Sequence, residues 1–129
     1  MVARLRVTGV RGFLQDERRT LDVGDELSVG RSRDADLSVR RAPRFLARRD
    51  RDDLLASERM RSISRIHVRI HYHAPDRVEI VDCSRNGTYV DRKRIDDAVE
   101  LTDLLLEPHE LTVGSSEKLR LELVGPGDD

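Results

Sequence analysis

Residues 65–73 read RIHVRIHYH, and this stretch decides the fold class of the chain. Ile66, Val68, Ile70 and Tyr72 alternate with polar residues, which is the period-two pattern of a half-buried β-strand. Shorter stretches of strand character, separated by turn residues, are found at 3–9, 20–23, 26–30, 35–39, 77–82, 88–90, 93–95, 109–114 and 119–124. About ten or eleven short strands at this spacing predict an all-β protein, an eleven-stranded antiparallel β-sandwich.

The composition predicts one soluble domain. The chain has 129 residues, of which 38% are charged and 37% are apolar. We expect a single domain over residues 1–124 and a disordered tail over residues 125–129, which read GPGDD. No apolar run is long enough to cross a membrane, and the N-terminus lacks a signal-peptide pattern. We therefore expect a cytoplasmic protein that does not bind membranes.

Cysteine and histidine spacing gives no metal motif. Cys83 is the single cysteine, which excludes an internal disulfide and a cysteine-based zinc site. His71 and His73 share one face of the predicted strand, but the sequence shows no third ligand near them. We therefore predict no metal site and no cofactor. The sequence also lacks a nucleophile–base pair and a phosphate-cradling glycine loop before a helix, so we expect no enzyme.

Residues 40–61 differ from the rest of the chain. They contain eight arginines and four acidic residues, a net charge of +4, whereas the whole chain has a net charge of −1. Good helix formers follow Pro43 without a further glycine or proline, which predicts either a short helix or a disordered loop. The near-neutral chain as a whole argues against general nucleic-acid binding.

Three loops carry polar side chains at predicted strand ends. They contain Gly30-Arg31, the stretch SISRIH at 62–67, and the stretch SRNG at 84–87. In the third, Asn86-Gly87 also predicts a β-hairpin turn, because both residues accept positive φ angles. Asp82 precedes this turn and is expected to support it. Binding groups are found on loops more often than on the elements they connect.

These motifs resemble those of the forkhead-associated (FHA) domain family. Gly30-Arg31, then Ser64-x-x-His67, then Asn86-Gly87 follow the order of that family's signature. The flanking stretches LSVGRSRDADLSV (27–39) and IVDCSRNGTYVDRKRI (80–95) are also similar to the family, and so is ELTVG at 110–114. The resemblance covers roughly residues 3–124 and implies an FHA/SMAD-like β-sandwich with binding loops at one end.

The resemblance implies phosphothreonine-peptide recognition without catalysis, in Ser/Thr kinase signalling. Arg31 and Ser64 are expected to bind the phosphate directly. Arg65 and Arg85 are expected to contact the phosphate or the peptide, and Asn86 the peptide main chain. Structural support is expected from Gly30, His67 and Gly87.

Elementary chemistry favours the same residue types. Phosphothreonine has a charge of about −1.5 to −2 and three strong acceptor oxygens. An arginine fork can bond two of these oxygens and stays charged, and a serine hydroxyl adds a short donor. Asparagine offers both a donor and an acceptor, which an extended peptide backbone requires.

The expected partner is a phosphothreonine-containing protein or peptide, from a Ser/Thr protein kinase or its substrate. Two alternatives stay open: an FHA fold used for phosphorylation-independent contacts or as a scaffold subunit, and nucleic-acid contact through residues 40–61. That segment stands where the family has a short loop. It could extend the site through Arg40, Arg41, Arg48 or Arg49, fold over the site, or remain a solvated loop.

Overall fold

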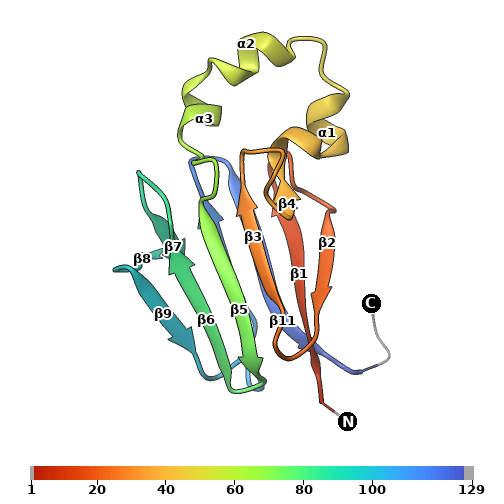
Figure 1. Cartoon of the computed structure of the whole chain (residues 1–129), viewed down its shortest axis with the longest axis vertical. Helices are drawn as coiled ribbons and strands as arrows, with labels where there is room; N and C mark the ends of the chain where they lie inside the picture. The colour runs from red at the N-terminus through yellow and green to blue at the C-terminus, as the bar shows by residue number, and fades with distance from the viewer. Residues whose placement is uncertain (1, 127–129) are drawn as a thin grey trace.

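The chain forms a β-sandwich with helices across one end (Figure 1). The computed structural model describes residues 2–126, so most of the predicted 125–129 tail lies outside the described residues. The sheets have the strand orders β2-β1-β11-β10-β7-β8 and β4-β3-β5-β6-β9. The strands are β1 (Arg4–Arg11), β2 (Arg18–Leu21), β3 (Glu26–Gly30), β4 (Leu37–Ser38), β5 (Val68–Ala74), β6 (Arg77–Asp82), β7 (Thr88–Val90), β8 (Lys93–Arg94), β9 (Ala98–Leu101), β10 (His109–Val113) and β11 (Glu117–Val124). The predicted all-β sandwich of eleven strands is confirmed.

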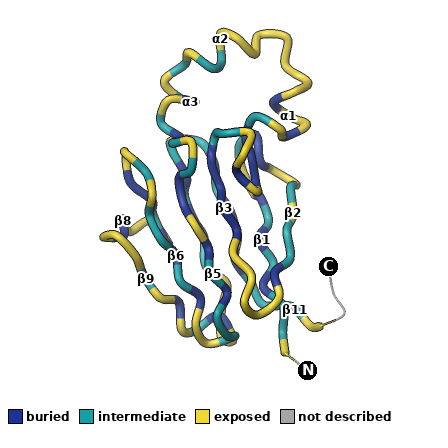
Figure 2. Tube along the Cα trace, viewed as in Figure 1, coloured by how far each residue is buried: buried dark blue, intermediate teal, exposed yellow. Residues whose placement is uncertain are grey.

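The strand β5 confirms the alternation from which the fold was predicted. Val68, Ile70 and Tyr72 are buried between the sheets, whereas Arg69 and His71 lie on the outer face. Buried and less buried residues alternate along β5 in Figure 2. Burial of each large apolar side chain contributes roughly 1.5–3 kcal/mol. The strand begins at Val68 rather than at residue 65, so the preceding residues are free to form a loop.

One strand pair departs from the predicted antiparallel arrangement. Strand β4 runs parallel to β3, with Val29 opposite Leu37. The loop between them folds back along β3, because the N–H of Ser28 donates to Asp36 Oδ2 at 2.9 Å and the N–H of Asp36 donates to Ser28 Oγ at 2.9 Å. These local bonds set a direction that strand propensity does not encode.

The turn predicted at Asn86-Gly87 is not a β-hairpin. Strand β6 belongs to the five-stranded sheet and β7 to the six-stranded sheet, so residues 83–87 cross between the sheets. Within this fully described loop only Gly87 has a positive φ, of 102°. A two-residue hairpin turn is found instead at Asp91-Arg92, between β7 and β8, with φ angles of 49° and 72°.

The basic segment forms an arch of short helices rather than one helix. It contains a 3₁₀ helix η1 (Val39–Arg41) and the α-helices α1 (Pro43–Leu46), α2 (Arg51–Leu55) and α3 (Glu58–Arg61). Ser57 caps α3 by accepting a hydrogen bond from the N–H of Met60 at 3.3 Å. In α2 no residue is buried, so the top of the arch faces solvent (Figure 2). None of the helices in residues 2–126 has the length and apolar character needed to cross a membrane.

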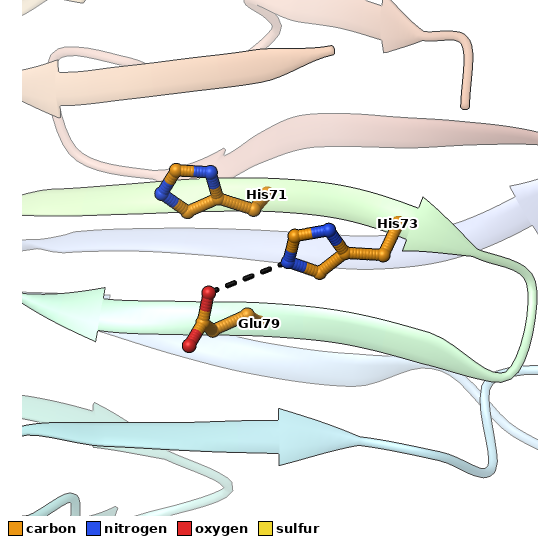
Figure 3. A group of neighbouring side chains, drawn as sticks. All are labelled: His71, His73 and Glu79. Carbon is orange, nitrogen blue, oxygen red and sulfur yellow. Dashed lines mark hydrogen bonds and ion pairs between the residues drawn. The ribbon is translucent and has the colours of Figure 1, made fainter. Parts of the chain in front are cut away.

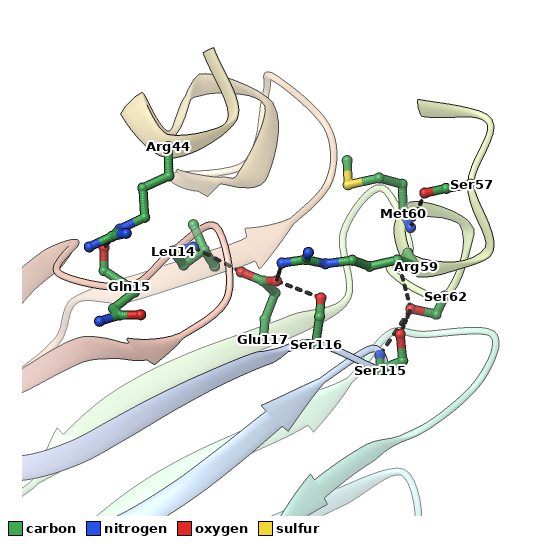
Figure 4. Close-up of polar contacts among 10 residues, drawn as sticks. All are labelled: Leu14, Gln15, Arg44, Ser57, Arg59, Met60, Ser62, Ser115, Ser116 and Glu117. Atoms are coloured by element: carbon green, nitrogen blue, oxygen red, sulfur yellow. Dashed lines mark hydrogen bonds and ion pairs between the residues drawn. The ribbon is translucent and has the colours of Figure 1, made fainter. Parts of the chain in front are cut away.

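Both ends of the arch are fixed to the sandwich. Phe45 of α1 packs edge-to-face on Phe13, with ring centroids 5.6 Å apart. The Arg59 guanidinium of α3 lies 4.0 Å from the centre of the same Phe13 ring, and its Nη2 lies 3.6 Å from Glu117 Oε2 (Figure 4). The cation–π contact holds α3 against the loop between β1 and β2, and the charge contact holds it against β11. The arch is therefore an ordered part of the domain.

Glu117 is the buried acidic residue at this anchor. Its side chain is 0% exposed and accepts a hydrogen bond from the N–H of Leu14 at 2.8 Å and from Ser116 Oγ at 2.6 Å (Figure 4). Buried carboxylates need such partners to offset the loss of water. A Cβ atom on Gly12 would lie 2.2 Å from Glu117 Oε2, so a side chain at this position would displace the carboxylate from its hydrogen bonds.

Candidate functional site

Three loops meet at the end of the sandwich under the arch. They are residues 31–36 after β3, residues 62–67 before β5, and residues 83–87 after β6 (Figure 1). The N–H of Arg31 donates to the carbonyl of Ser64 at 3.0 Å, and the N–H of Ser32 donates to the carbonyl of Arg65 at 3.0 Å. The N–H of Arg85 donates to Ser64 Oγ at 3.0 Å. Loops distant in the sequence are therefore joined through Ser64.

Gly30 permits the close approach of the first two loops. A Cβ atom at this position would lie 2.1 Å from the carbonyl oxygen of Arg65, which is backbone and cannot move aside. Any side chain at position 30 would therefore separate Arg31 from Ser64.

His67 connects the second loop to the third. Its side chain is buried; Nδ1 accepts a hydrogen bond from the N–H of Ser64 at 3.1 Å, and Nε2 donates to the carbonyl of Gly87 at 2.9 Å. Burial lowers the pKa of His67 below its usual value, against the opposing effects of Gly87 and the Asp82 charge. The ring is therefore neutral at neutral pH, with its proton on Nε2.

Asp82 was expected to support a hairpin turn, but it supports the loop of residues 83–87, which crosses between the two sheets. Its Oδ1 accepts hydrogen bonds from the N–H of Ser84 at 2.9 Å, from Ser84 Oγ at 2.5 Å and from Thr88 Oγ1 at 2.9 Å. Ser84 Oγ in turn accepts from the N–H of Gly87 at 2.8 Å. Burial alone would raise the pKa of Asp82, but these hydrogen bonds outweigh it and lower the pKa. The carboxylate stays charged and fixes residues 83–87.

The three loops and α3 enclose a surface depression of about 480 Å³. Its lining residues are Arg31, Arg61, Ile63, Ser64, Arg65, Ile66, Cys83 and Arg85. The structure thus brings together four of the five residues expected to bind a peptide. Arg61 was not predicted and comes from α3; its place three residues before Ser64, in the arginine-rich segment, was the available signal.

Asn86 lies beside this depression rather than in its wall. It is exposed and lines a neighbouring depression together with Glu58, Arg61, Ser62 and Arg85. Arg61 and Arg85 line both hollows, so Asn86 is next to the main depression and not on another face of the domain.

The arginines of the depression have no acidic partners. Across residues 2–126, the side chains of Arg31, Arg61, Arg65 and Arg85 make no hydrogen bond or ion pair with another described residue. Several arginines elsewhere are paired with acidic residues; Arg69 Nη1, for example, lies 3.0 Å from Glu26 Oε1. Guanidinium groups gathered without counter-charges create a positive potential that attracts anions. This depression is therefore suited to an anionic ligand.

Comparison with known protein families gives a match to the FHA domain over residues 27–116, which is more than half of the chain. The chain belongs to the FHA domain family. A comparison with curated protein sequences found no significant match.

Solved FHA domains share the fold at low sequence identity. The FHA domain of an Arabidopsis thaliana hypothetical protein is 20% identical with a TM-score of 0.68, covering 99% of this chain and 92% of that chain. The FHA domain of CT664 from Chlamydia trachomatis is 21% identical with a TM-score of 0.65, covering 92% and 96%. Mycobacterium tuberculosis EmbR, in complex with a low-affinity phosphopeptide, is 19% identical with a TM-score of 0.62, covering 98% of this chain and 26% of EmbR.

This FHA domain carries a second group of potential ligand residues on the outer face of its five-stranded sheet. His71 and His73 project from β5 beside Glu79 of β6 (Figure 3). The interpretation that no third ligand lies near the two histidines is therefore wrong. The register that places His71 opposite Glu79 is set by the β5–β6 connection and is not evident from the spacing of the histidines.

Proposed function

We propose that this FHA domain, over residues 1–124, is a phosphothreonine-peptide-binding module without catalytic activity. The observation that carries the proposal is the depression that is lined by Ser64 and by four arginines without acidic partners. A phosphate dianion provides the negative counter-charge that these arginines lack, and its three oxygens accept hydrogen bonds from several guanidinium groups at once.

Each residue has a distinct proposed role. Arg31 and Ser64 bind the phosphate directly, since the paired backbones of their loops fix their spacing. Arg65 and Arg85 contact the phosphate or the adjoining peptide. Asn86, in the neighbouring hollow, hydrogen-bonds the peptide main chain as it leaves the depression.

The Ser64 hydroxyl is oriented for donation. Its oxygen already accepts a hydrogen bond from the N–H of Arg85, which leaves its proton for another acceptor. A phosphate oxygen in the depression is such an acceptor. His67 fixes the backbone of Ser64, so a ligand does not have to order this loop.

The complex of EmbR with a phosphopeptide supports this use of the fold. By analogy, the partner of this domain is a phosphothreonine-containing protein, namely a Ser/Thr protein kinase or one of its substrates. A short peptide of this kind would bind with a Kd in the micromolar range, about −8 kcal/mol.

The hydrogen bonding of the arch disfavours nucleic-acid binding through residues 40–61. Most of its arginines are already engaged with carbonyl or carboxylate groups of the domain: Arg41, Arg44, Arg48, Arg51 and Arg59. Nucleic-acid affinity depends on many free cationic groups that neutralise successive phosphates. The arch offers few of these.

The substitution Arg31→Ala tests the proposal against phosphorylation-independent binding. Loss of this guanidinium should weaken a phosphothreonine peptide at least about tenfold while the fold stays intact. Arg33→Ala is the matched control, because Arg33 is exposed, lies in the same loop and lines none of the hollows described above. Equal affinities of the two variants would refute a phosphate-binding role for Arg31.

A further inference from the structure

A second, smaller hollow adjoins the proposed phosphate site. It has a volume of about 210 Å³, against about 480 Å³ for the main depression. Its lining residues are Arg31, Ser32, Arg40, Leu55 and Arg65. Arg31 and Arg65 line both hollows, so the two form one continuous basic surface. We call the smaller hollow the Arg40 pocket.

The helical arch builds the outer wall of the Arg40 pocket. Arg40 belongs to η1 and Leu55 to α2, both within the arch. Ala42 and Phe45 are buried just after Arg40, which fixes the path of η1 over the sandwich. The pocket therefore depends on the arch and on the two loops beneath it.

Arg40 has no protein partner for its charge. Its Nε is buried without a hydrogen-bond partner, and across residues 2–126 its side chain makes no ion pair. A buried donor left without a hydrogen-bond partner is unfavourable, and a ligand that accepts this hydrogen bond removes the cost. By contrast the next residue, Arg41, donates to the carbonyl of Asp36 at 3.1 Å. The backbone of Arg40 is therefore fixed in η1, while its guanidinium group makes no hydrogen bond or ion pair with a described residue.

Ser32 adds a neutral donor to the same pocket. Its Oγ accepts a hydrogen bond from the N–H of Asp34 at 3.0 Å, which leaves the hydroxyl proton for a ligand. Three guanidinium groups and a hydroxyl are thus offered in one small space. Bringing like charges together without an acidic neighbour is unfavourable until an anion binds.

From these observations we propose that the Arg40 pocket binds a second anionic side chain of the same peptide, close in sequence to the phosphothreonine. The inference rests on the proposed phosphothreonine site and adds the class of ligand: peptides with two neighbouring anionic groups. The shared chemistry is an oxyanion that accepts hydrogen bonds from Arg40 and Ser32, supplied by a phosphorylated residue or a carboxylate.

A peptide scan tests the pocket. A phosphothreonine peptide is prepared with alanine, glutamate or a second phosphothreonine at each neighbouring position, and affinities are measured by fluorescence anisotropy. At one or more positions on one side, the anion should raise affinity about tenfold over alanine. A gain with glutamate identifies a carboxylate as a ligand of the pocket, and a gain with the second phosphothreonine alone identifies a phosphate group.

Variants separate this proposal from the proposed function. Arg40→Ala should remove the gain from the second anion while keeping the binding of the singly phosphorylated peptide. Arg49→Ala is the matched control, since Arg49 is exposed, lies in the same arch and lines neither hollow. If every second anion gives no gain, or if both variants lose it equally, the Arg40 pocket is refuted. If the singly phosphorylated peptide does not bind, the proposed function itself fails.

A second inference rests on a different observation, the histidine cluster on the outer face of the sheet. The ligand atoms of His71, His73 and Glu79 all lie within 4.8 Å of one another (Figure 3). His73 Nε2 lies 3.3 Å from Glu79 Oε1. In a tetrahedral zinc site with bonds of about 2.0–2.1 Å, neighbouring ligand atoms are separated by about 3.3 Å. One edge of a metal site is therefore already formed.

The remaining ligand is available. His71 has one long contact, 3.8 Å from its Nε2 to Glu26 Oε1, and the two imidazole rings are parallel within 4°. Rotation about the broad terminal torsion of His71 turns its nitrogen toward the position between His73 and Glu79. We propose that His71, His73 and Glu79 bind a divalent transition-metal ion such as Zn²⁺, with a water completing the site.

Calorimetric titration of the protein with zinc sulfate tests this site. One ion per chain should bind, and His73→Ala and Glu79→Gln should each weaken binding at least about tenfold. Glu100→Gln is the matched control. Glu100 lies opposite Glu79 on the neighbouring strand β9 and is not part of the cluster. The absence of binding would overturn the proposal. So would binding that is lost in His109→Gln but retained in His73→Ala, since Asp103, Glu107 and His109 form a separate group.

Discussion

His67 donates from Nε2 to the carbonyl oxygen of Gly87 at 2.9 Å, and this bond ties the loop before β5 to the loop that crosses between the sheets. The same ring accepts the N–H of Ser64 at 3.1 Å. One buried imidazole thus sets the relative position of the two loops that present Ser64, Arg65 and Arg85. The residues proposed to bind a peptide are therefore positioned by a fully buried side chain.

Replacement of His67 should loosen both loops. His67→Ala leaves the N–H of Ser64 and the carbonyl of Gly87 without partners and creates a cavity, which we expect to cost about 2–4 kcal/mol of unfolding free energy. Urea denaturation measures this cost. His71→Ala, on the outer face of β5, is the control and should change stability by less than about 1 kcal/mol. Equal effects of the two substitutions would contradict the linking role.

Acidification should weaken the same link. The pKa of His67 is lowered in the folded protein, so the unfolded chain binds the proton more readily. The stability contribution is therefore complete above the unfolded pKa of about 6.5 and declines as the pH falls below it. Denaturation curves of the wild type and His67→Asn measured across this range isolate the effect. If the difference in unfolding free energy between the wild type and His67→Asn does not change with pH, protonation of His67 does not weaken the link.

His109 should show the opposite pH dependence. Burial alone would lower the pKa of His109, but hydrogen bonds to Asp91 and Asp103 outweigh it and raise the pKa. Its contribution to stability is thus complete below about pH 6.5 and is lost as the pH rises through the folded pKa. Titration of the imidazole by NMR should give a pKa above the usual histidine value. A value at or below it would show that the two carboxylates do not stabilise the charged ring.

The hairpin turn between β7 and β8 carries a correctable strain. Arg92 adopts a φ of 72°, which a residue with a Cβ occupies at a cost of roughly 1 kcal/mol. Arg92→Gly should therefore raise the unfolding free energy by about 0.5–1 kcal/mol, as measured by thermal and urea denaturation. Asp91 is left in place because it accepts a hydrogen bond from the N–H of Glu110 at 2.9 Å. A destabilised variant would mean that the Arg92 side chain contributes more than its backbone costs.

Gly12 and Gly24 form a matched pair for testing the anchor of the arch. Both have positive φ, 88° and 96°, but a Cβ on Gly12 would collide with Glu117 whereas one on Gly24 has nothing within 4 Å. Gly12→Ala should therefore cost about 2 kcal/mol more than Gly24→Ala and should speed amide exchange in α3. Equal costs would mean that the Glu117 carboxylate can move without loosening the arch.

Features fixed by local pattern could be predicted from the sequence. The alternation of Val68, Ile70 and Tyr72 gave the sheet face, and Gly30-Arg31 was placed at the end of a strand, where the structure has it. Strand β9 (Ala98–Leu101) was not predicted, because a strand of four residues with one buried side chain gives only a weak signal, although Val99 and Leu101 alternate with exposed neighbours. Strand β9 is short and pairs with β6 at the edge of the five-stranded sheet.

Features fixed by tertiary contact could not be predicted. Arg61 reaches the depression only because Arg59 and Met60 hold α3 against the sandwich. Residues 83–87 have the composition of a hairpin turn, but their flanking strands pair in different sheets. In both cases long-range packing decides the position, and local sequence patterns do not encode it.

The most direct test of the account is a titration followed by backbone amide NMR shifts. Three matched peptides carry phosphothreonine, phosphoserine or unmodified threonine at one position. We predict that the phosphothreonine peptide binds in about the micromolar range and shifts the amides of Arg31, Ser64 and Arg85, while the unmodified peptide does not bind. Binding of the unmodified peptide with equal affinity, or shifts confined to another face of the sandwich, would contradict the phosphate-binding depression.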